Sequence, residues 1–425
     1  MKSKMDQELF SEINPLYASR KDEPNVFRIR IRMRDRIDPE TMRRAVDTTM
    51  TRYPYFCVEL QKKENRYLFA QNSRPIVIAD SPRGVVLASE ESNYHFVAFS
   101  CFDDWMFMDM SHALTDGTGA IEVIRTLLYY YCTEHYHARF EKNGIRLAGD
   151  LIPAEEWEDP ALRIPDPPAS EGEEIPDALD LIEEGKLQAD KEKTVFSITI
   201  PESEFMRFNL QNDGSPATMT TLFLSRAVAA LYPDSEKPIR ISLCVNLRKA
   251  LRAPLAHQSL VGGAWLEYKE KMRNWPLDRQ ATAYRGMVFV QTRDESALAS
   301  LAGINRNARN LLSMETDRER ADAAGRTSDF LKRVLTATVS YVGKADLGEA
   351  ESYIREFHAW ANAMNEPLLI EISAVNHQFT LDVIQNFSSP VYVNAFLRQL
   401  EENGIRYVRD DGAKPVFSPI RLPWL

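Results

Sequence analysis

An acidic, proline-rich stretch lies near the middle of the chain and separates two series of predicted strands and helices. Residues 149–193, which begin GDLIPAEEWEDPALRIPDPP, lack the apolar periodicity of a helix or a strand. This composition is typical of an extended connection. A chain of 425 residues is also larger than one hydrophobic core usually supports. We therefore expect one lobe at residues 1–150, a connection at 151–193 and a second lobe at 194–425.

The first lobe opens with a strand that leads directly into a helix. Residues 26–34, VFRIRIRMR, alternate with period two, so isoleucines and a methionine line one face and four arginines the other. A row of charges like this is usually a solvated face of a sheet. The alternative is contact with a phosphorylated ligand. Residues 38–54 then predict a helix, with Asp38 or Asp35 as a cap and Pro39 in the first turn.

The same alternation of strands and helices continues through both halves. Two predicted helices end in Tyr-Pro, at residues 53–54 and 232–233, which hints at duplicated lobes. The interleaving indicates an α/β (α+β) fold with mixed sheets and flanking helices. Further strands are expected at residues 55–60, 67–70, 75–79, 84–87, 94–110 (a hairpin), 194–201, 239–247, 335–342, 368–375 and 379–387, and further helices at 119–135, 218–233, 300–333 and 391–404.

Composition excludes several classes of protein. Hydrophobic residues at 44% and charged residues at 27% describe a globular protein, and the net charge of -10 disfavours nucleic acid as a partner. No apolar run approaches the roughly 18 residues of a membrane span. The first residues lack the apolar core of a secretory signal, and the four cysteines show no CxxC spacing. We expect a cytoplasmic protein with reduced thiols.

Residues 110–119, MSHALTDGTG, contain the strongest candidate for chemistry. His112 lies at a predicted turn from strand to helix, four residues before Asp116. An imidazole can accept a proton at neutral pH. Three other interpretations fit these residues: Asp116 is a helix cap, His112 is a packed polar residue, or both bind a metal. For a metal, only Asp109 and Cys101 lie nearby as further ligands, and the pair His135 and His137 lacks clustered partners, so we expect no metal site.

The stretch also resembles the HxxxDG motif of the chloramphenicol-acetyltransferase-like superfamily, which includes condensation domains of peptide synthetases, wax ester synthases and alcohol acetyltransferases. Further segments resemble this superfamily in the same order along nearly the whole chain. The C-terminal one is most similar to the alcohol acetyltransferases. The segments are residues 25–56, 241–251 (ISLCVNLRKAL), 338–347 (TVSYVGKADL) and 374–405.

The resemblance implies two lobes of similar topology with an active-site tunnel between them. His112 matches the general base of the superfamily, and Gly117 the glycine beside the reaction centre. Asp116 matches an aspartate that turns away from the substrate and pairs with an arginine, for which we expect Arg248.

The resemblance also suggests residues that contact the substrates. Thr115, Thr118 or a main-chain amide near Gly117 could stabilise the oxyanion. Ser340 matches a strand that borders the tunnel. Tyr341 stands where asparagine is common, which leaves the contribution of the second lobe to the acceptor site open.

The expected function is acyl transfer from acyl-CoA, in particular acetyl-CoA, to a small alcohol or amine by direct attack. Acyl-CoA is then a co-substrate, no cofactor stays bound, and one chain builds the site as a monomer. One alternative is a stand-alone condensation enzyme that takes its acyl group from an acyl carrier protein. The other is a catalytically silent binding protein of the same fold.

Overall fold

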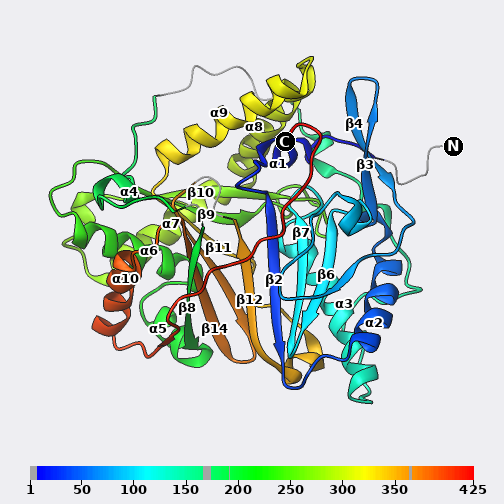
Figure 1. The fold of residues 1–425 in the computed structure, drawn as a ribbon. Helices are drawn as coiled ribbons and strands as arrows, with labels where there is room; N and C mark the ends of the chain where they lie inside the picture. The colour runs from blue at the N-terminus through cyan, green and yellow to red at the C-terminus, as the bar shows by residue number, and fades with distance from the viewer. Residues whose placement is uncertain (1–6, 166–173, 191, 363–365) are drawn as a thin grey trace.

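A computed structural model describes residues 7–165, 174–190, 192–362 and 366–425, and their strands form three sheets (Figure 1). Within these residues the first sheet has the strand order β12(Ile354–Ala361), β2(Val26–Met33), β7(Trp105–Ser111), β6(Val97–Phe102) and β5(Ile78–Asp80). The second has the order β10(Val261–Tyr268), β9(Ile239–Asn246), β11(Ala337–Tyr341), β13(Leu368–Val375), β14(Gln378–Gln385), β8(Thr194–Pro201) and β15(Val408–Arg409). The third, small sheet has the order β1(Gln7–Glu8), β4(Arg66–Gln71) and β3(Val58–Lys63).

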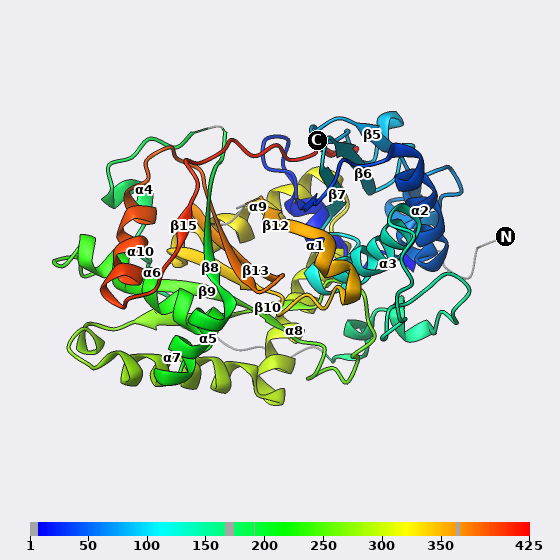
Figure 2. The ribbon, with the colours of Figure 1, turned by 90° about the horizontal axis from the view of Figure 1, so that it is seen from below.

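Helices surround these sheets (Figures 1 and 2). The α-helices of the described residues are α1(Ile13–Ala18), α2(Pro39–Arg52), α3(Gly117–His135), α4(Leu181–Glu184), α5(Glu202–Gln211), α6(Pro216–Leu231), α7(Leu277–Thr292), α8(Asp294–Ser313), α9(Asp317–Val334) and α10(Val391–Glu402). Short 3-10 turns lie at η1(Pro54–Phe56), η2(Glu90–Ser92), η3(Ala154–Glu156), η4(Pro160–Arg163), η5(Glu270–Met272) and η6(Gly348–Tyr353).

The first sheet and its two helices form as their sequence predicts. Ile29 and Ile31 of β2 are buried in one core with the apolar residues of α2 and α3, which lie side by side (Figure 2). The Asp38 side chain accepts the main-chain N–H of Thr41 at 2.8 Å and so caps α2, and Pro39 begins the helix. Both the strand and the helix at this place are confirmed.

The second sheet carries a separate core beneath α6 and α10. Ser215 and Thr218 cap each other's main-chain N–H at the start of α6, so the helix begins at a capping box. Its buried side, which includes Leu222 and Val228, packs in one cluster with Phe396 of α10 and with the apolar face of the sheet. Parallel pairing of β11 with β9 and β13 beside antiparallel pairs confirms the expected mixed sheet.

Strand β12 departs from the expected division of the chain. It lies in the range 194–425 that we assigned to the second lobe, yet it pairs along β2 in the first sheet. The segment after β15 also returns across both lobes to end near α1 (Figure 1), where Trp424 stacks on Tyr17 at 4.1 Å and Ile420 bridges to Leu87. The range 194–425 therefore contributes to both lobes.

The expectation of a solvated arginine face is wrong for three of the four arginines of β2 and its end. Arg28 is 2% exposed and bound to Asp109, and Arg30 and Arg32 are half-buried. Two neighbouring strands cover this face: Asp109 of β7 binds Arg28, and β12 brings Glu356 and Trp360 against Arg32 and Arg30. Only Arg34 is exposed.

Some predicted elements differ in the structure, and some elements of the structure were not predicted. Residues 84–87 form no strand, because only Leu87 makes an isolated bridge. Residues 300–333 are divided between α8 and α9, and neither β10 nor α7 was expected. The connection at 151–193 is not a free linker in its described part, since Glu156 is buried against Arg52.

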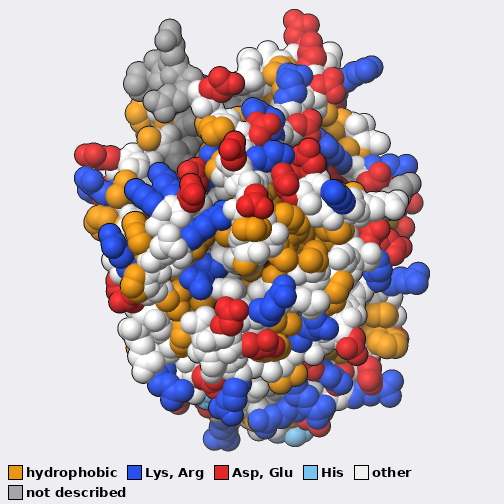
Figure 3. All heavy atoms as spheres, turned by 90° about the vertical axis from the view of Figure 1, so that its left-hand side faces the viewer, with side chains coloured by type: hydrophobic (Ala, Val, Ile, Leu, Met, Phe, Trp, Pro, Cys, Tyr) orange, Lys and Arg blue, Asp and Glu red, His pale blue; other side chains and the backbone are white. Residues whose placement is uncertain are grey.

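The described part of the chain was also searched for membrane-spanning helices, disulfides and metal sites. None of its helices is long and apolar enough to cross a membrane. Its four cysteines are free thiols, and none of its acidic, histidine and cysteine side chains form a cluster that could hold a metal. On the face that carries α10, basic and acidic side chains mix around a group of hydrophobic ones, so this face is not a uniformly basic surface (Figure 3).

Candidate active site

The loop from Ser111 to Asp116 joins the end of β7 to the start of α3, as the sequence predicts. The Asp116 carboxylate accepts the main-chain N–H groups of Thr118 at 2.9 Å and Gly119 at 3.4 Å. It therefore acts as the N-cap of α3 and fixes the geometry of the turn.

The same carboxylate binds a side chain of the second lobe. Arg248 Nη2 donates to Asp116 Oδ1 at 2.9 Å, and the main-chain N–H of Leu260 donates to Oδ2 at 2.9 Å. Asp116 is 1% exposed and Arg248 3%. Arg248 also donates from Nε to the Ala256 carbonyl and from Nη2 to the Gln258 carbonyl, both at 2.7 Å, and from Nη1 to Asn246 Oδ1 at 3.3 Å. The pair is buried and hydrogen-bonded within the protein, so it holds the loop against the second lobe.

His112 stands at the start of this loop and is half-buried. Its main-chain N–H donates to the Asn25 carbonyl at 3.0 Å, and its ring lies 4.7 Å from the ring of Phe27. Burial lowers the pKa of His112, and this outweighs the charge of Asp116 and a hydrogen bond with the Thr115 main chain, which both raise it. The imidazole is therefore neutral at pH 7 and can accept a proton.

Two glycines allow the lobes to approach each other here. A Cβ atom on Gly117 would lie 2.4 Å from Cγ2 of Val342, the residue that follows β11. A Cβ atom on Gly119 would lie 2.9 Å from the main-chain oxygen of His257. At Gly119 the Thr115 hydroxyl lies nearer still, at 2.1 Å, so a side chain there would displace the loop, whereas at Gly117 it would have to displace the Val342 side chain.

The other predicted substrate-contacting residues differ in how deeply they are buried. Thr115 is fully buried and donates through its hydroxyl to the His257 carbonyl at 2.5 Å, so it is a structural residue of the loop. Thr118 is half-buried and its hydroxyl lies 3.4 Å from Asn246 Nδ2. Ser340 and Tyr341 are half-buried at the end of β11, directly before Val342. Thr118 thus contacts the end of β9, and Val342, directly after β11, lies beside Gly117.

His257 is a residue that the sequence did not reveal. It lies in the loop between β9 and β10 and is 3% exposed. Its Nδ1 is 2.6 Å from the Tyr55 hydroxyl and its Nε2 contacts Arg146, both in the first lobe. No acidic or glycine-rich neighbour in the sequence signals this contact.

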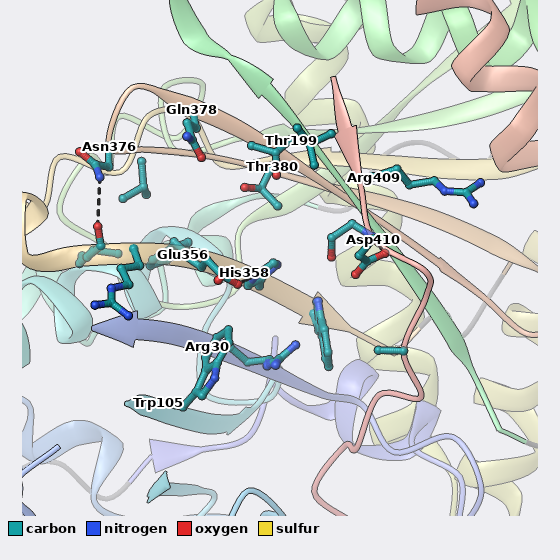
Figure 4. Close-up of a pocket in the computed structure, with 18 residues that line it drawn as sticks. Arg30, Trp105, Thr199, Glu356, His358, Asn376, Gln378, Thr380, Arg409 and Asp410 are labelled. Carbon is teal, nitrogen blue, oxygen red and sulfur yellow. Dashed lines mark hydrogen bonds and ion pairs between the residues drawn. The ribbon is translucent and has the colours of Figure 1, made fainter. Parts of the chain in front are cut away.

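Neither of the two described cavities reaches His112. One has a volume of about 280 Å³ and lies between the sheets, where β12 faces β8 and β14 (Figure 4). The other is a surface hollow beside α10. At His112 itself, Val342 lies in contact range of Gly117, where the resemblance implies a passage.

Similar proteins are found by comparison of structures and not by comparison of sequences. No family description matches the sequence, and no curated protein matches it. Solved structures match over nearly the full length. Polyketide synthase associated protein 5 from Mycobacterium tuberculosis is 12% identical, with a TM-score of 0.59 over 92% of this chain and 96% of that one. TRI101 of F. sporotrichioides, solved with coenzyme A and T-2, is 10% identical, with a TM-score of 0.60 over 95% and 99%.

A third similar structure is the condensation domain from monacolin K polyketide synthase MokA. It is 11% identical, with a TM-score of 0.58 over 94% of this chain and 96% of that one. Identities this low establish the fold and not the chemistry. The chain has the two-lobed fold of the chloramphenicol-acetyltransferase-like superfamily, as the HxxxDG resemblance indicated.

Proposed function

We propose that this protein is an acyltransferase that moves an acyl group from the thioester of acyl-CoA to a small alcohol or amine. The observation that carries the proposal is the placement of His112: it is half-buried at the start of a loop that Asp116 and Arg248 hold across the lobes, where burial lowers its pKa. The fold shared with a coenzyme A-bound TRI101 structure supports a CoA thioester as the donor.

The reaction needs a base and no covalent enzyme intermediate if both substrates are held together. His112 takes the proton from the acceptor O–H or N–H while that atom attacks the carbonyl carbon of the thioester. The tetrahedral intermediate then collapses, the C–S bond breaks, and His112 returns the proton to the leaving CoA sulfur. Atoms and charge balance without a metal or a redox partner.

Negative charge on the carbonyl oxygen needs hydrogen-bond donors. The Asp116 cap uses the main-chain N–H groups of Thr118 and Gly119 but not that of Gly117. The Gly117 N–H and the Thr118 hydroxyl are thus the donors that remain at the start of α3. Thr115 is not one of them, because its hydroxyl is bound to the His257 carbonyl.

Replacement of the base tests the proposal directly. In a thiol-release assay with CoA esters of graded chain length and pooled alcohols and amines, we expect His112→Ala to lower turnover by about 10²–10⁴-fold, as for other lost general bases. His377→Ala is the matched control, because His377 is 90% exposed and should keep full activity. Full activity of His112→Ala would contradict the mechanism.

A carrier-protein donor is the second candidate, because condensation domains share the fold. Mass spectrometry of products formed from acyl-CoA, compared with those from a charged carrier protein, separates the two donors. If CoA binds but neither donor gives product with any acceptor, the protein is a binding member of the fold.

A further inference from the structure

The arginine face of β2 carries a guanidinium that lacks an anionic partner. Arg28 donates to both oxygens of Asp109 at 2.8 Å. Arg32 donates to two carboxylates, each at 2.8 Å. Arg30 lies between them and makes no hydrogen bond or ion pair with any described residue. The β7 residue opposite Arg28 is Asp109, whereas opposite Arg30 it is a phenylalanine.

Two indole rings hold this unpaired guanidinium. The Arg30 Cζ atom is 4.5 Å from the ring centroid of Trp105 and 3.8 Å from that of Trp360. Burial lowers the pKa of Arg30 to about 10, and the charges of nearby Asp382, Glu356 and Asp410 offset this only in part. None of these carboxylates makes an ion pair with the half-buried guanidinium. The rings contact the faces of a guanidinium, whereas its N–H groups point outward in its own plane. Those N–H groups therefore still need acceptors.

Arg30 lines the cavity of about 280 Å³ between the two sheets. In Figure 4, Arg30 and His358 come from the first sheet, and Thr199 and Thr380 lie across the space on the second. Asp410, after β15, also lines it. The volume lies at the small end of ligand pockets, so it suits a small molecule and not a whole coenzyme A.

His358 is a second cation in the cavity wall, and the buried carboxylate of Asp382 neutralises its charge. Its Nδ1 lies 3.0 Å from Asp382, which is 1% exposed and also accepts the Ser197 hydroxyl at 2.5 Å. Burial pulls the pKa of His358 down, but the charge of Asp382 and hydrogen bonds to Asp382 and Glu356 outweigh it and raise the pKa to about 9. The imidazolium and Asp382 thus neutralise each other.

The balance of charge around the cavity limits its ligand. The lining residues of the described chain provide more cations than anions, but buried Asp382 lies behind them and reduces the excess to one charge. The cations are Arg30, Arg355, His358 and Arg409, and the anions are Glu356 and Asp410. A singly charged carboxylate matches this excess, whereas a phosphate dianion would exceed it. A carboxylate also fits the planar fork of a guanidinium, as Asp109 does on Arg28.

We propose that this cavity is a binding site for a small monocarboxylate, whose carboxylate pairs with Arg30 while its apolar part lies against Trp105 and Trp360. The site lies at the far end of β7 from the His112 loop and does not depend on the acyltransferase function.

Calorimetric titration of the full chain tests the site with defined probes. Benzoate and hexanoate should bind saturably, benzamide should bind at least tenfold more weakly, and inorganic phosphate should not compete. We expect Arg30→Gln to raise the dissociation constant about 10- to 100-fold, as for a lost charge-assisted hydrogen bond. Arg30→Lys keeps the charge but loses the fork and should give an intermediate value.

Two control variants make the result specific. Arg36→Gln removes an 83% exposed arginine outside the cavity and should leave benzoate binding unchanged. His112→Ala should also leave it unchanged, so failure of the carboxylate site and failure of the acyltransferase can be told apart. A cooperative melting transition of Arg30→Gln without ligand checks that the variant is folded, and benzoate should raise the melting temperature of the wild type more than that of the variant. The proposal is overturned if no carboxylate binds, if Arg30→Gln binds as the wild type does, or if phosphate binds more tightly than either acid.

Discussion

At the scale of single residues, the protonation of His112 decides whether the proposed chemistry can run. Burial lowers its pKa below the ordinary value, so the base stays deprotonated at pH values where a free imidazole, with a pKa of about 6.5, is half protonated. We expect kcat/KM to be constant through neutral pH and to fall tenfold per pH unit on the acid side, with its midpoint below the ordinary imidazole value. A pH–rate profile with an alcohol acceptor measures this. An acid limb centred above that value would mean that another group is the base.

The residues around His112 differ in how far sequence could predict them. The cap made by Asp116 depends on residues two and three positions away, so local sequence suffices. The partner of Asp116, Arg248, is 132 positions away and was expected only through the resemblance. Val342 and His257 reach the loop from the second lobe, and no local pattern encodes such contacts.

At the scale of elements, the start of α3 combines a helix cap with a buried ion pair. Asp116→Ala removes both and leaves Arg248 buried without its partner, which typically costs about 3–5 kcal/mol. Asp38→Ala is the matched control, since Asp38 caps α2 through Thr41 without a buried arginine, and a lost cap costs about 1 kcal/mol. Urea unfolding should therefore show a much larger loss for Asp116→Ala. Equal losses would mean that the ion pair adds nothing to the cap.

The strands that sequence did not predict have a common physical cause. The pairing of β12 with β2 shifts register between Ile354 and Glu356, and this irregularity disrupts the period-two pattern that reveals a strand. Strand β10 contains Gly262 and Gly263, which are typical of turns. Because β12 was not expected, Glu356 and Trp360 could not be predicted as neighbours of Arg32 and Arg30. The expected hairpin does contain Asp109 and Asp104, but its sequence does not reveal that they pair with the β2 arginines.

At the scale of the whole molecule, the loop between β9 and β10 joins the lobes through His257. Arg146 can only donate, so the Nε2 atom of His257 accepts and its Nδ1 carries the proton. Nδ1 then donates to the Tyr55 hydroxyl at 2.6 Å, and Tyr55 donates to Glu156 Oε2 at 3.1 Å. This directed chain requires a neutral His257.

Protonation of His257 should therefore weaken the contact between the lobes. Burial, followed by the charges of Arg146, Arg248 and Arg52, lowers the pKa of His257 well below its ordinary value. Below a pH of about 6.5 the unfolded chain then binds a proton at this position that the folded protein does not, so the free energy of unfolding falls as the pH falls. Urea unfolding between pH 5 and 8 should show this acid loss in the wild type and a smaller slope in His257→Gln. His377→Gln, at a 90% exposed position, should keep the wild-type slope. If His257→Gln instead loses stability with acid as steeply as the wild type, His257 does not control how the lobes respond to pH.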